Sequence, residues 1–320
     1  MKSISVVIPN FNGRHLLELN LPSLYKSLIG SGILKYEVIV SDDASNDDSI
    51  NFLQQNYPNI VIVTSPQNTG FAGNVNRGVV KSSCDLVFIL NTDVTLTPNY
   101  FMPLMHWFDR EDTFGVMGKI VSPDHSSVQD TAKYPAHSFS KINATCNFQT
   151  VNEYFSYTLF LTGANALIDR TKLLEMNGFC ELFNPYYSED AELGIRAWRS
   201  GYKLYFDDRA VCFHENSATI RKQSVTKVQR IAWRNRILMH YLHINGLELL
   251  WYFIRTVANA LFKLIFSFNS QLLNALYLFL QHKKEVDSWK RKHINKLPKS
   301  TAEIMKFLVE DLKGKEVERF

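Results

Sequence analysis

The sequence has few cysteines, and they lack the close spacing of a disulfide framework or a metal-binding pair. None of the four forms a C-x-x-C motif; they are Cys84, Cys146, Cys180 and Cys212. Cysteines scattered in this way predict reduced, buried thiols in a cytosolic protein. The sequence also shows no apolar signal segment after Met1, no internal repeat and no low-complexity stretch. We therefore expect no secretory leader and no repeat architecture.

The charged residues are unevenly distributed along the 320-residue chain. Apolar residues make up 46% and charged residues 21%, which is typical of globular proteins and excludes global disorder. The net charge is only +4, but residues 1–215 carry 16 Lys and Arg against 23 Asp and Glu, and residues 216–320 carry 19 against 8. The basic second part predicts an anionic partner. Nucleic acid is disfavoured, because the aromatic residues there lie in apolar stripes rather than among the basic residues.

The first 90 residues alternate between strand-like and helix-like segments. Short β-rich runs predict strands at residues 4–9, 36–40, 60–63 and 86–90. Helical spacing of apolar residues predicts helices at 14–30, 49–56 and 70–81. Alternation at this spacing is typical of βαβ units and predicts an α/β fold with a mostly parallel sheet.

The middle of the chain is less regular. We expect loops around His125, Pro135 and His137, and a strand over residues 160–168 that contains a tight glycine turn. Two short runs predict closing strands, at residues 203–206 and 210–214. The sequence pattern of this region therefore indicates its secondary structure less clearly than the pattern of the first 90 residues does.

Polar turns follow three of the predicted strands: Pro9–Gly13, Asp42–Asp48 and Asn91–Asp93. Ligands of open parallel sheets bind beyond the carboxyl ends of the strands, which is where these turns lie. A single acidic turn is ordinarily a helix cap, and Asp47 or Asp48 is expected to act in this way. Two acidic turns at one edge of a sheet favour a ligand site, and a carboxylate there can bind a hard divalent cation.

A helix that begins near Ser188 carries a second acidic pair. Ser188 is expected to be its N-cap, with Glu189 and Asp190 in the first turn. Either these acids only cap the helix, or one of them is a general base held near an acceptor hydroxyl. Farther along, Trp198, Arg196 and Arg199 either bind the acceptor or supply helix packing and surface charge, and we expect the second. His214, at the end of the last predicted strand, is either a packed polar residue or a metal ligand.

Several segments together resemble the family 2 inverting glycosyltransferases, which have the GT-A fold. The opening SVVIPNFNG with VSDDASND looks like the start of that family, and NTGFAGNVNRG is similar to a segment of its rhamnosyltransferase-like branch. LNTDV stands at the place of the family's D-x-D motif, and LTGA and SEDAEL match later motifs. These segments are Ser5–Gly13, Val40–Asp47, Asn68–Gly78, Leu90–Val94, Leu161–Ala164 and Ser188–Leu193.

The resemblance covers roughly residues 3–220. It implies a GT-A domain over residues 1–220, with a doubly wound, mostly parallel sheet flanked by helices. The change of composition after residue 220 separately predicts a C-terminal helical extension over residues 221–320. The resemblance also implies a nucleotide pocket, in which Asp43 would read the imide of uracil or thymine. The other residues of that pocket would be Pro9, Asn10, Asn12, Asn68, Gly70, Arg77 and Thr92. For Arg77, contact with a phosphate and pairing with a nearby acid both stay open.

By the same resemblance, Asp93 would bind the Mn²⁺ or Mg²⁺ that bridges the donor diphosphate. Asn91 stands where many members have the first Asp of the motif, and it can still offer a neutral oxygen. His214 sits where several members have a histidine ligand, and a neutral imidazole suits either ion beside one carboxylate.

The resemblance further implies that Asp190 is the general base and Glu189 its partner, and that Gly163 and Ala164 contact the acceptor. A single displacement would then move a hexose or deoxyhexose from a UDP- or dTDP-sugar to a glycan or polyprenyl-linked acceptor, with inversion. The alternatives are a sugar-nucleotide nucleotidyltransferase and a catalytically inactive membrane-bound scaffold. A nucleotidyltransferase would require a basic, glycine-rich phosphate loop after the first strand, and Pro9–Gly13 contains no Lys or Arg.

The C-terminal region combines apolar helical stripes with flanking basic residues. Residues 246–266 contain Glu248, Arg255 and Lys263, and a charge at a helix centre costs about 2.5–3.5 kcal/mol on insertion scales. A spanning hairpin, an interfacial helical pair and a soluble helical subdomain all stay open, and the charges favour helices that lie on an anionic membrane surface. We therefore expect a cytoplasmic protein that is peripheral on the inner face of the cell membrane.

Overall fold

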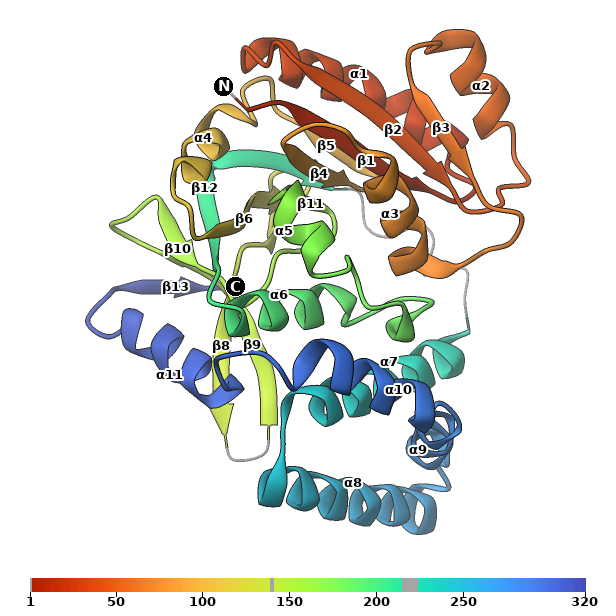
Figure 1. Cartoon of the computed structure of the whole chain (residues 1–320), viewed down its shortest axis with the longest axis vertical. Helices are drawn as coiled ribbons and strands as arrows, with labels where there is room; N and C mark the ends of the chain where they lie inside the picture. Colours follow the sequence, from red (N-terminus) through yellow and green to blue (C-terminus); the bar gives the residue numbers. More distant parts are fainter. Residues whose placement is uncertain (1, 139–140, 215–223) are drawn as a thin grey trace.

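The computed structural model describes residues 2–138, 141–214 and 224–320, and a mixed β-sheet forms its centre (Figure 1). Ten strands have the order β10-β12-β6-β11-β4-β1-β2-β3, with β5 paired to β12 and β7 paired to β6, and a smaller sheet has the order β13-β9-β8. The strands are β1 Ile4–Asn10, β2 Tyr36–Asp42, β3 Val61–Thr64, β4 Leu86–Leu90, β5 Val94–Leu96, β6 Thr113–Val121, β7 Val128–Asp130, β8 Ala132–Ser138, β9 Lys141–Thr150, β10 Phe155–Tyr157, β11 Asn165–Asp169, β12 Lys203–His214 and β13 Val317–Arg319.

Helices cover both faces of the large sheet. The α-helices of the described residues are α1 Arg14–Gly30, α2 Ser49–Asn56, α3 Gly70–Lys81, α4 Met102–Met105, α5 Arg170–Glu175, α6 Glu189–Arg199, α7 Val225–His243, α8 Gly246–Ser267, α9 Gln271–Gln281, α10 Lys283–Trp289 and α11 Thr301–Asp311. Because side chains alternate across a strand, Val6 of β1 joins the core under α1, α2 and α4, and Val7 joins the core under α3, α5 and α6. This arrangement confirms the predicted α/β class.

The four strands predicted in the first 90 residues are parallel neighbours in the sheet. Strand β1 pairs with β2 and β4, and β2 pairs with β3. The register sets Asn10 at the end of β1 opposite Asp42 at the end of β2. The turn that follows β4 begins at the same edge, so the polar strand ends meet as predicted (Figure 1).

The expectation of an irregular middle region was wrong. Strands β6 to β10 follow one another between Thr113 and Tyr157. Both Pro135 and His137 lie in β8 rather than in loops, whereas His125 lies in a turn. Strand β11 begins only at Asn165, five residues later than predicted. The two predicted closing strands are one strand, β12, whose pairing with β6 shifts between Asp207 and Val211. Interrupted apolar patterns concealed these pairings, because edge strands and bulges break the alternation of side chains.

The prediction that the cysteines are buried is confirmed for three of the four. Cys84, Cys180 and Cys212 are buried, but Cys146 in β9 is only half-buried.

The C-terminal helices lie on the side of α6 that faces away from β1–β3 (Figure 1). Helix α7 packs against α9, α8 contacts both of them, and α11 packs against β8 and α6. Helix α8 is long and apolar enough to cross a membrane by length and composition, and 11% of its most apolar window is buried. Its exposed apolar side chains are Leu247, Leu250, Trp251, Ile254, Val257, Leu261, Phe262, Leu264, Ile265 and Phe266. We call this set the α8 apolar face.

Helix α6 carries a buried ion pair, which corrects the expectation that its arginines carry surface charge. Arg196 is 1% exposed, and its Nη2 donates to Glu192 Oε2 at 2.8 Å and to the Gly178 carbonyl oxygen at 2.8 Å. Arg199 is also buried, and its Nη1 lies 3.2 Å from His243 Nδ1 of α7. Sequence alone did not indicate this burial, because the Gly178 carbonyl oxygen and His243 come from other parts of the chain.

We predict that Glu192→Ala lowers the free energy of unfolding by about 3–5 kcal/mol, because it leaves the Arg196 charge buried without a carboxylate partner. The matched change at the exposed Arg14–Glu18 pair, Glu18→Ala, should cost less than about 1 kcal/mol. Urea unfolding measures both. Similar losses in the two variants would contradict a structural role for the buried pair.

The pair also predicts acid sensitivity. Burial raises the pKa of Glu192, but Arg196 and His243 outweigh it and lower that pKa from 4.5 to about 2. The stabilisation is therefore complete above about pH 4.5 and is lost as the pH falls toward 2. In Glu192→Ala, the free energy of unfolding should lack the decrease that Glu192 causes between about pH 4.5 and pH 2 in the wild-type protein.

Candidate functional site

Two neighbouring cavities open at the edge of the sheet where the polar strand ends meet. The first has a volume of about 270 Å³ and lies at the ends of β1, β2 and β4; we call it the strand-end cavity. The second has a volume of about 620 Å³ and lies between β7, β11 and the start of α6; we call it the α6 cavity. Both are lined by Phe71, Asn91, Tyr186 and His214, so they join at these residues.

Most of the predicted nucleotide-pocket residues line the strand-end cavity: Pro9, Asn10, Asp43, Asn68, Gly70 and Thr92. Asn12 does not line it. Its Oδ1 instead accepts a hydrogen bond from the Asn46 backbone N–H at 2.7 Å, which ties the turn after β1 to the turn after β2. Phe11 lines the cavity and is 41% exposed.

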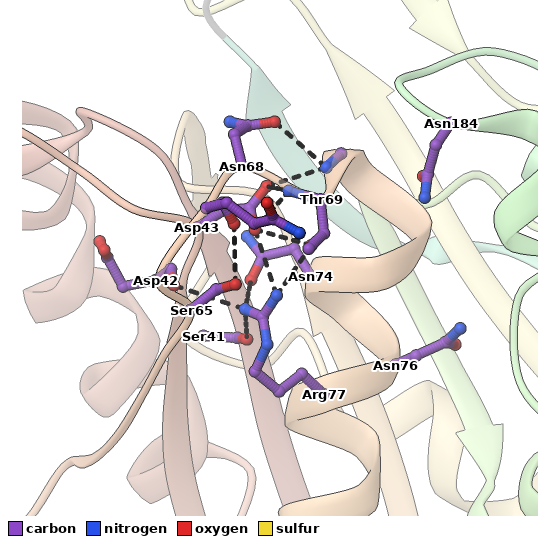
Figure 2. Close-up of polar contacts among 12 residues, drawn as sticks. Ser41, Asp42, Asp43, Ser65, Asn68, Thr69, Asn74, Asn76, Arg77 and Asn184 are labelled. Carbon is purple, nitrogen blue, oxygen red and sulfur yellow. Dashed lines mark hydrogen bonds and ion pairs between the residues drawn. The ribbon is translucent and has the colours of Figure 1, made fainter.

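Asp43 holds the beginning of α3 against the end of β2 (Figure 2). Its carboxylate accepts hydrogen bonds from the backbone N–H of Thr69 at 2.9 Å and of Gly70 at 2.9 Å, and from Thr69 Oγ1 at 2.7 Å. Free N–H groups at a helix start are satisfied in this way by capping side chains. Gly70 is required here, because its φ is +80° and a Cβ would lie 2.8 Å from Pro185 Cα.

Arg77 pairs with a nearby acid, which was one of its two predicted roles. Its Nη2 lies 3.2 Å from Asp43 Oδ1 and its Nη1 donates to Asn74 Oδ1 at 3.0 Å (Figure 2). The guanidinium thus forms part of the wall behind the cavity and does not line it.

The end of β1 carries a buried polar pair. Asn10 Nδ2 donates to Asp42 Oδ2 at 2.8 Å, and Ser45 Oγ donates to the same carboxylate at 2.6 Å. Asn10 Oδ1 is buried without a hydrogen-bond partner among the described atoms. A buried polar atom of this kind, in a residue that lines a cavity, is consistent with a donor supplied by a ligand.

The capping prediction for the next turn holds for Asp47. Its carboxylate accepts from the backbone N–H of Ser49 at 3.1 Å and of Arg14 at 3.0 Å, so it serves the starts of both α2 and α1. Asp48 occupies the N-cap position of α2 but makes no side-chain cap bond.

Asp93 and His214 face one another where the two cavities join. Asp93 Oδ1 lies 3.3 Å from His214 Nε2, and His214 Nδ1 lies 3.0 Å from Gln129 Oε1. Asn91 lines both cavities beside them. Within the described residues no three His, Cys, Asp or Glu side chains are grouped to hold a metal. A carboxylate, an imidazole and an amide oxygen fit a divalent cation whose other ligands come from a substrate or water.

Glu189 and Asp190 lie together in the α6 cavity. Glu189 is 8% exposed, and its Oε2 is buried without a partner among the described atoms. Burial, and then the charge of Asp190, raise the pKa of Glu189 above its ordinary value. Burial also raises the pKa of Asp190, although the Ala191 N–H that donates to Asp190 Oδ1 at 2.7 Å acts in the other direction. Two carboxyl groups with raised pKa values are suited to proton transfer.

The segment before α6 differs from its prediction. Ser188 stands at the N-cap position, but its φ is +72° and its side chain makes no cap bond. Tyr187 before it also has a positive φ, of +79°. Left-handed conformations at non-glycine residues cost free energy and occur where surrounding contacts hold them.

Gly163 and Ala164 line the α6 cavity, as expected for acceptor contacts. A Cβ on Gly163 would lie 2.7 Å from the Phe71 ring, so glycine permits this close approach.

Sequence analysis missed several residues that line the α6 cavity, among them Gln129, Asp130, Tyr186 and Tyr187. The tyrosine pair could have been noticed, because it immediately precedes Ser188 in the sequence. Gln129 and Asp130 carried no signal, since they come from the short edge strand β7.

Comparison with known proteins identifies the family. Residues 5–176, more than half of the chain, match the model of glycosyl transferase family 2. The chain therefore belongs to this family and is a glycosyltransferase, as the motifs predicted.

Two curated relatives are informative. The chain is 23% identical over 210 residues to the N-acetylglucosaminyl-diphospho-decaprenol L-rhamnosyltransferase of Mycobacterium tuberculosis, covering 58% of this chain and 68% of that protein. It is 32% identical over 109 residues to the GalNAc(5)-diNAcBac-PP-undecaprenol beta-1,3-glucosyltransferase of Campylobacter jejuni, covering 33% and 34% of the two chains. Both are similar to this chain over part of their length.

Among solved structures, GalNAc-T7 with UDP, GalNAc and Mn²⁺ is similar with a TM-score of 0.62 and 14% identity. The match covers 98% of this chain and 57% of the GalNAc-T7 chain. At this identity the match is evidence for the fold alone, and it confirms the predicted GT-A architecture.

We predict that Glu189→Gln raises stability at neutral and alkaline pH. A carboxyl group whose pKa is higher in the folded state loses stability as the pH rises from its unfolded value of 4.5 through the folded value. The variant should therefore be more stable by on the order of 1 kcal/mol at about pH 8, and the gain should diminish toward pH 4.5. Thermal unfolding at both pH values measures this.

The control is Glu175→Gln on the exposed surface of α5, which should change stability little at either pH. A Glu189→Gln effect that is zero, or is equal at both pH values, would show that the pKa of Glu189 is not raised.

Proposed function

We propose that the protein is a metal-assisted, inverting glycosyltransferase that moves a hexose or deoxyhexose from a UDP- or dTDP-sugar to a hydroxyl of a lipid-linked glycan in bacterial surface polysaccharide assembly. One observation carries this proposal: the two cavities join at Asn91 and His214, Asp93 lies beside His214, and the Glu189–Asp190 pair lies in the second cavity. A donor in the strand-end cavity and an acceptor in the α6 cavity would bring their reacting atoms together there.

The donor nucleotide would occupy the strand-end cavity. Asp43 would read the uracil or thymine imide while its carboxylate also holds α3, and Phe11 provides an exposed ring at the cavity wall. GalNAc-T7, which shares the fold, was solved with UDP.

Asp93, His214 and the Asn91 amide oxygen would hold the Mn²⁺ or Mg²⁺. When bound, such an ion acts as a Lewis acid that stabilises the leaving diphosphate. The Gln129 contact to His214 Nδ1 would orient the imidazole, as outer hydrogen bonds do for metal-binding histidines. The Mn²⁺ in GalNAc-T7 supports a divalent cation in this fold.

Asp190 would accept the proton of the acceptor hydroxyl as that oxygen attacks the anomeric carbon. Glu189 beside it raises the affinity of the pair for a proton, because two close carboxylates in a buried site resist full ionisation. Attack on the face opposite the leaving diphosphate forms one glycosidic bond and breaks one bond to the nucleotide, and it inverts the anomeric centre.

The acceptor class is proposed from the relatives. The Mycobacterium and Campylobacter proteins are named for acceptors on decaprenol and undecaprenol diphosphates. Tyr186 and Tyr187 line the α6 cavity and offer rings on which a sugar can pack.

We further propose that the chain has two functional parts. Residues 1–220 form the GT-A domain, and residues 221–320 hold the enzyme on the inner face of the cell membrane. The α8 apolar face would enter the interface between headgroups and acyl chains. Near it, Arg236 and Lys263 lie over the Trp233 ring at 5.3 and 4.6 Å, and neither pairs with a carboxylate among the described residues. Unpaired cations beside an apolar face suit an anionic leaflet.

We predict that Asp190→Asn lowers transfer at least about 100-fold, because general base catalysis typically contributes that much or more. Donor affinity should stay within about twofold, since Asp190 lines only the acceptor-side cavity. UDP or dTDP release, measured with acceptor and with or without Mn²⁺, tests the rate, and thermal shift tests donor binding. The control is Asp109→Asn, an exposed carboxylate after α4. Retained turnover in Asp190→Asn would refute the base assignment.

We predict that the full chain binds vesicles of phosphatidylcholine with phosphatidylglycerol more tightly than vesicles of phosphatidylcholine alone. The double change Ile254→Glu and Leu261→Glu on the α8 apolar face should weaken binding at least about tenfold, because it moves two charges toward the acyl chains. Leu34→Glu is the matched control, at a site that is 96% exposed outside this region. Equal binding of both variants, measured by vesicle sedimentation, would rule out the α8 apolar face as the contact.

A further inference from the structure

One side chain of the C-terminal region contacts the backbone that leads into the acidic pair. Asn235 of α7 is fully buried, and its Nδ2 lies within hydrogen-bond distance of the carbonyl oxygens of Phe183 at 2.7 Å, Tyr186 at 2.8 Å and Tyr187 at 2.8 Å, which share its two N–H donors. We call residues 184–188 the α6-entry loop. The Asn235 amide group therefore contacts two carbonyl oxygens of the α6-entry loop and the carbonyl oxygen of the residue that precedes the loop.

The neighbouring arginine supports the same contact. Arg234 Nε and Nη2 both donate to Asn235 Oδ1, at 2.8 and 2.6 Å, and Nη2 also donates to the Asn184 carbonyl oxygen at 2.5 Å. No carboxylate among the described residues forms an ion pair with this guanidinium. The two bonds from Arg234 fix the Asn235 amide with its nitrogen toward the loop, because the oxygen is already engaged.

The other side of the α6-entry loop is tied to the start of α3. The Phe71 backbone N–H donates to the Pro185 carbonyl oxygen at 2.9 Å, and the Ala72 N–H donates to Asn184 Oδ1 at 3.2 Å. Figure 2 shows Asn184 across from the beginning of α3. The loop thus runs between the strand-end cavity and the α6 cavity, and Tyr186 lines both.

The conformation of this loop requires outside support. Tyr187 and Ser188 both have left-handed φ values, +79° and +72°, which side chains with a Cβ rarely adopt. Conformations of this kind persist where surrounding structure determines them, and they are common at functional sites. The Asn235 bond to the Tyr187 carbonyl oxygen lies directly beside both residues.

We infer that Asn235, held by Arg234, is a positioning residue that sets the α6-entry loop and thereby aligns Tyr186, Tyr187 and the Glu189–Asp190 pair with the acceptor. The inference rests on the proposed function for its substrate, an acceptor sugar in the α6 cavity. Under this inference the C-terminal region contributes to the active site. The α6-entry loop belongs to the first part of the chain, but the side chain that positions it belongs to α7.

Asn235→Asp tests the inference with almost no change in shape. It keeps the Oδ1 contact to Arg234 but turns a second carboxylate oxygen, rather than N–H donors, toward three carbonyl oxygens. We expect kcat with acceptor to fall on the order of 100-fold, the effect of a misplacement of about 1 Å at a reacting centre. Donor affinity, measured by thermal shift, should stay within about twofold.

Hydrogen exchange supplies a readout that does not depend on activity. In Asn235→Asp, peptides covering residues 183–190 should exchange faster, and peptides of β1 and α1 should be unchanged. The matched control is Asn274→Asp in α9, whose Nδ2 contacts only Ser270 Oγ. If Asn235→Asp does not fold, Arg234→Gln carries the same comparison, since it removes the support of the amide.

The outcomes separate the two proposals. Wild-type kcat in folded Asn235→Asp, unchanged exchange in the loop, or an equal loss of donor binding would overturn the positioning role. If the wild-type protein transfers no sugar but the loop alone exchanges faster in the variant, the positioning of the loop stands and the proposed function fails.

Discussion

The Asp43 carboxylate, which holds the start of α3 at the end of β2, is the contact on which the rest of the site depends. It satisfies the N–H groups of Thr69 and Gly70 and pairs with Arg77. The residues that follow, Phe71 and Ala72, then hold the α6-entry loop from one side. A single carboxylate at a strand end therefore sets the position of both cavity walls.

This arrangement explains why the two parts of the chain cannot be treated as independent. The α6-entry loop is held by α3 on one side and by Asn235 of α7 on the other. Helix α6 is held in turn by the Arg196 bond to the Gly178 carbonyl oxygen and by His243 of α7, whose Nε2 lies 3.6 Å from Glu192 Oε1. The uneven charge of the sequence follows the same two parts. Residues 1–215 have an excess of acidic residues and include the acidic site residues, whereas residues 216–320 have an excess of basic residues and include the apolar helices.

The first part of the fold could be predicted because its signals are local. Apolar runs such as Leu86–Leu90 followed by polar turns identify buried parallel strands and the edge where they end. The motifs then predicted the family, and the residues at Asp93, His214 and Asp190 do lie around two joined cavities.

The remaining features depend on partners far away in the sequence. Arg196 looked like a surface residue because its partners include the Gly178 carbonyl oxygen, which sequence spacing does not reveal. Gln129 comes from a three-residue edge strand with no apolar alternation. Asn235 sits in a basic helix, and its role follows only from a loop some 50 residues earlier. Asn12 failed as a cavity residue because its side chain bonds to the next turn.

The central claim is that the strand-end cavity binds a uridine or thymidine diphosphate together with a divalent cation. Thermal unfolding of the full chain with UDP, dTDP, GDP and ADP, each with and without Mn²⁺, tests it most directly, because a ligand that binds only the folded state raises its apparent stability. The account predicts a higher Tm with UDP or dTDP that depends on Mn²⁺, and little change with the purine nucleotides. No shift with any nucleotide, or equal shifts with all four, would contradict it.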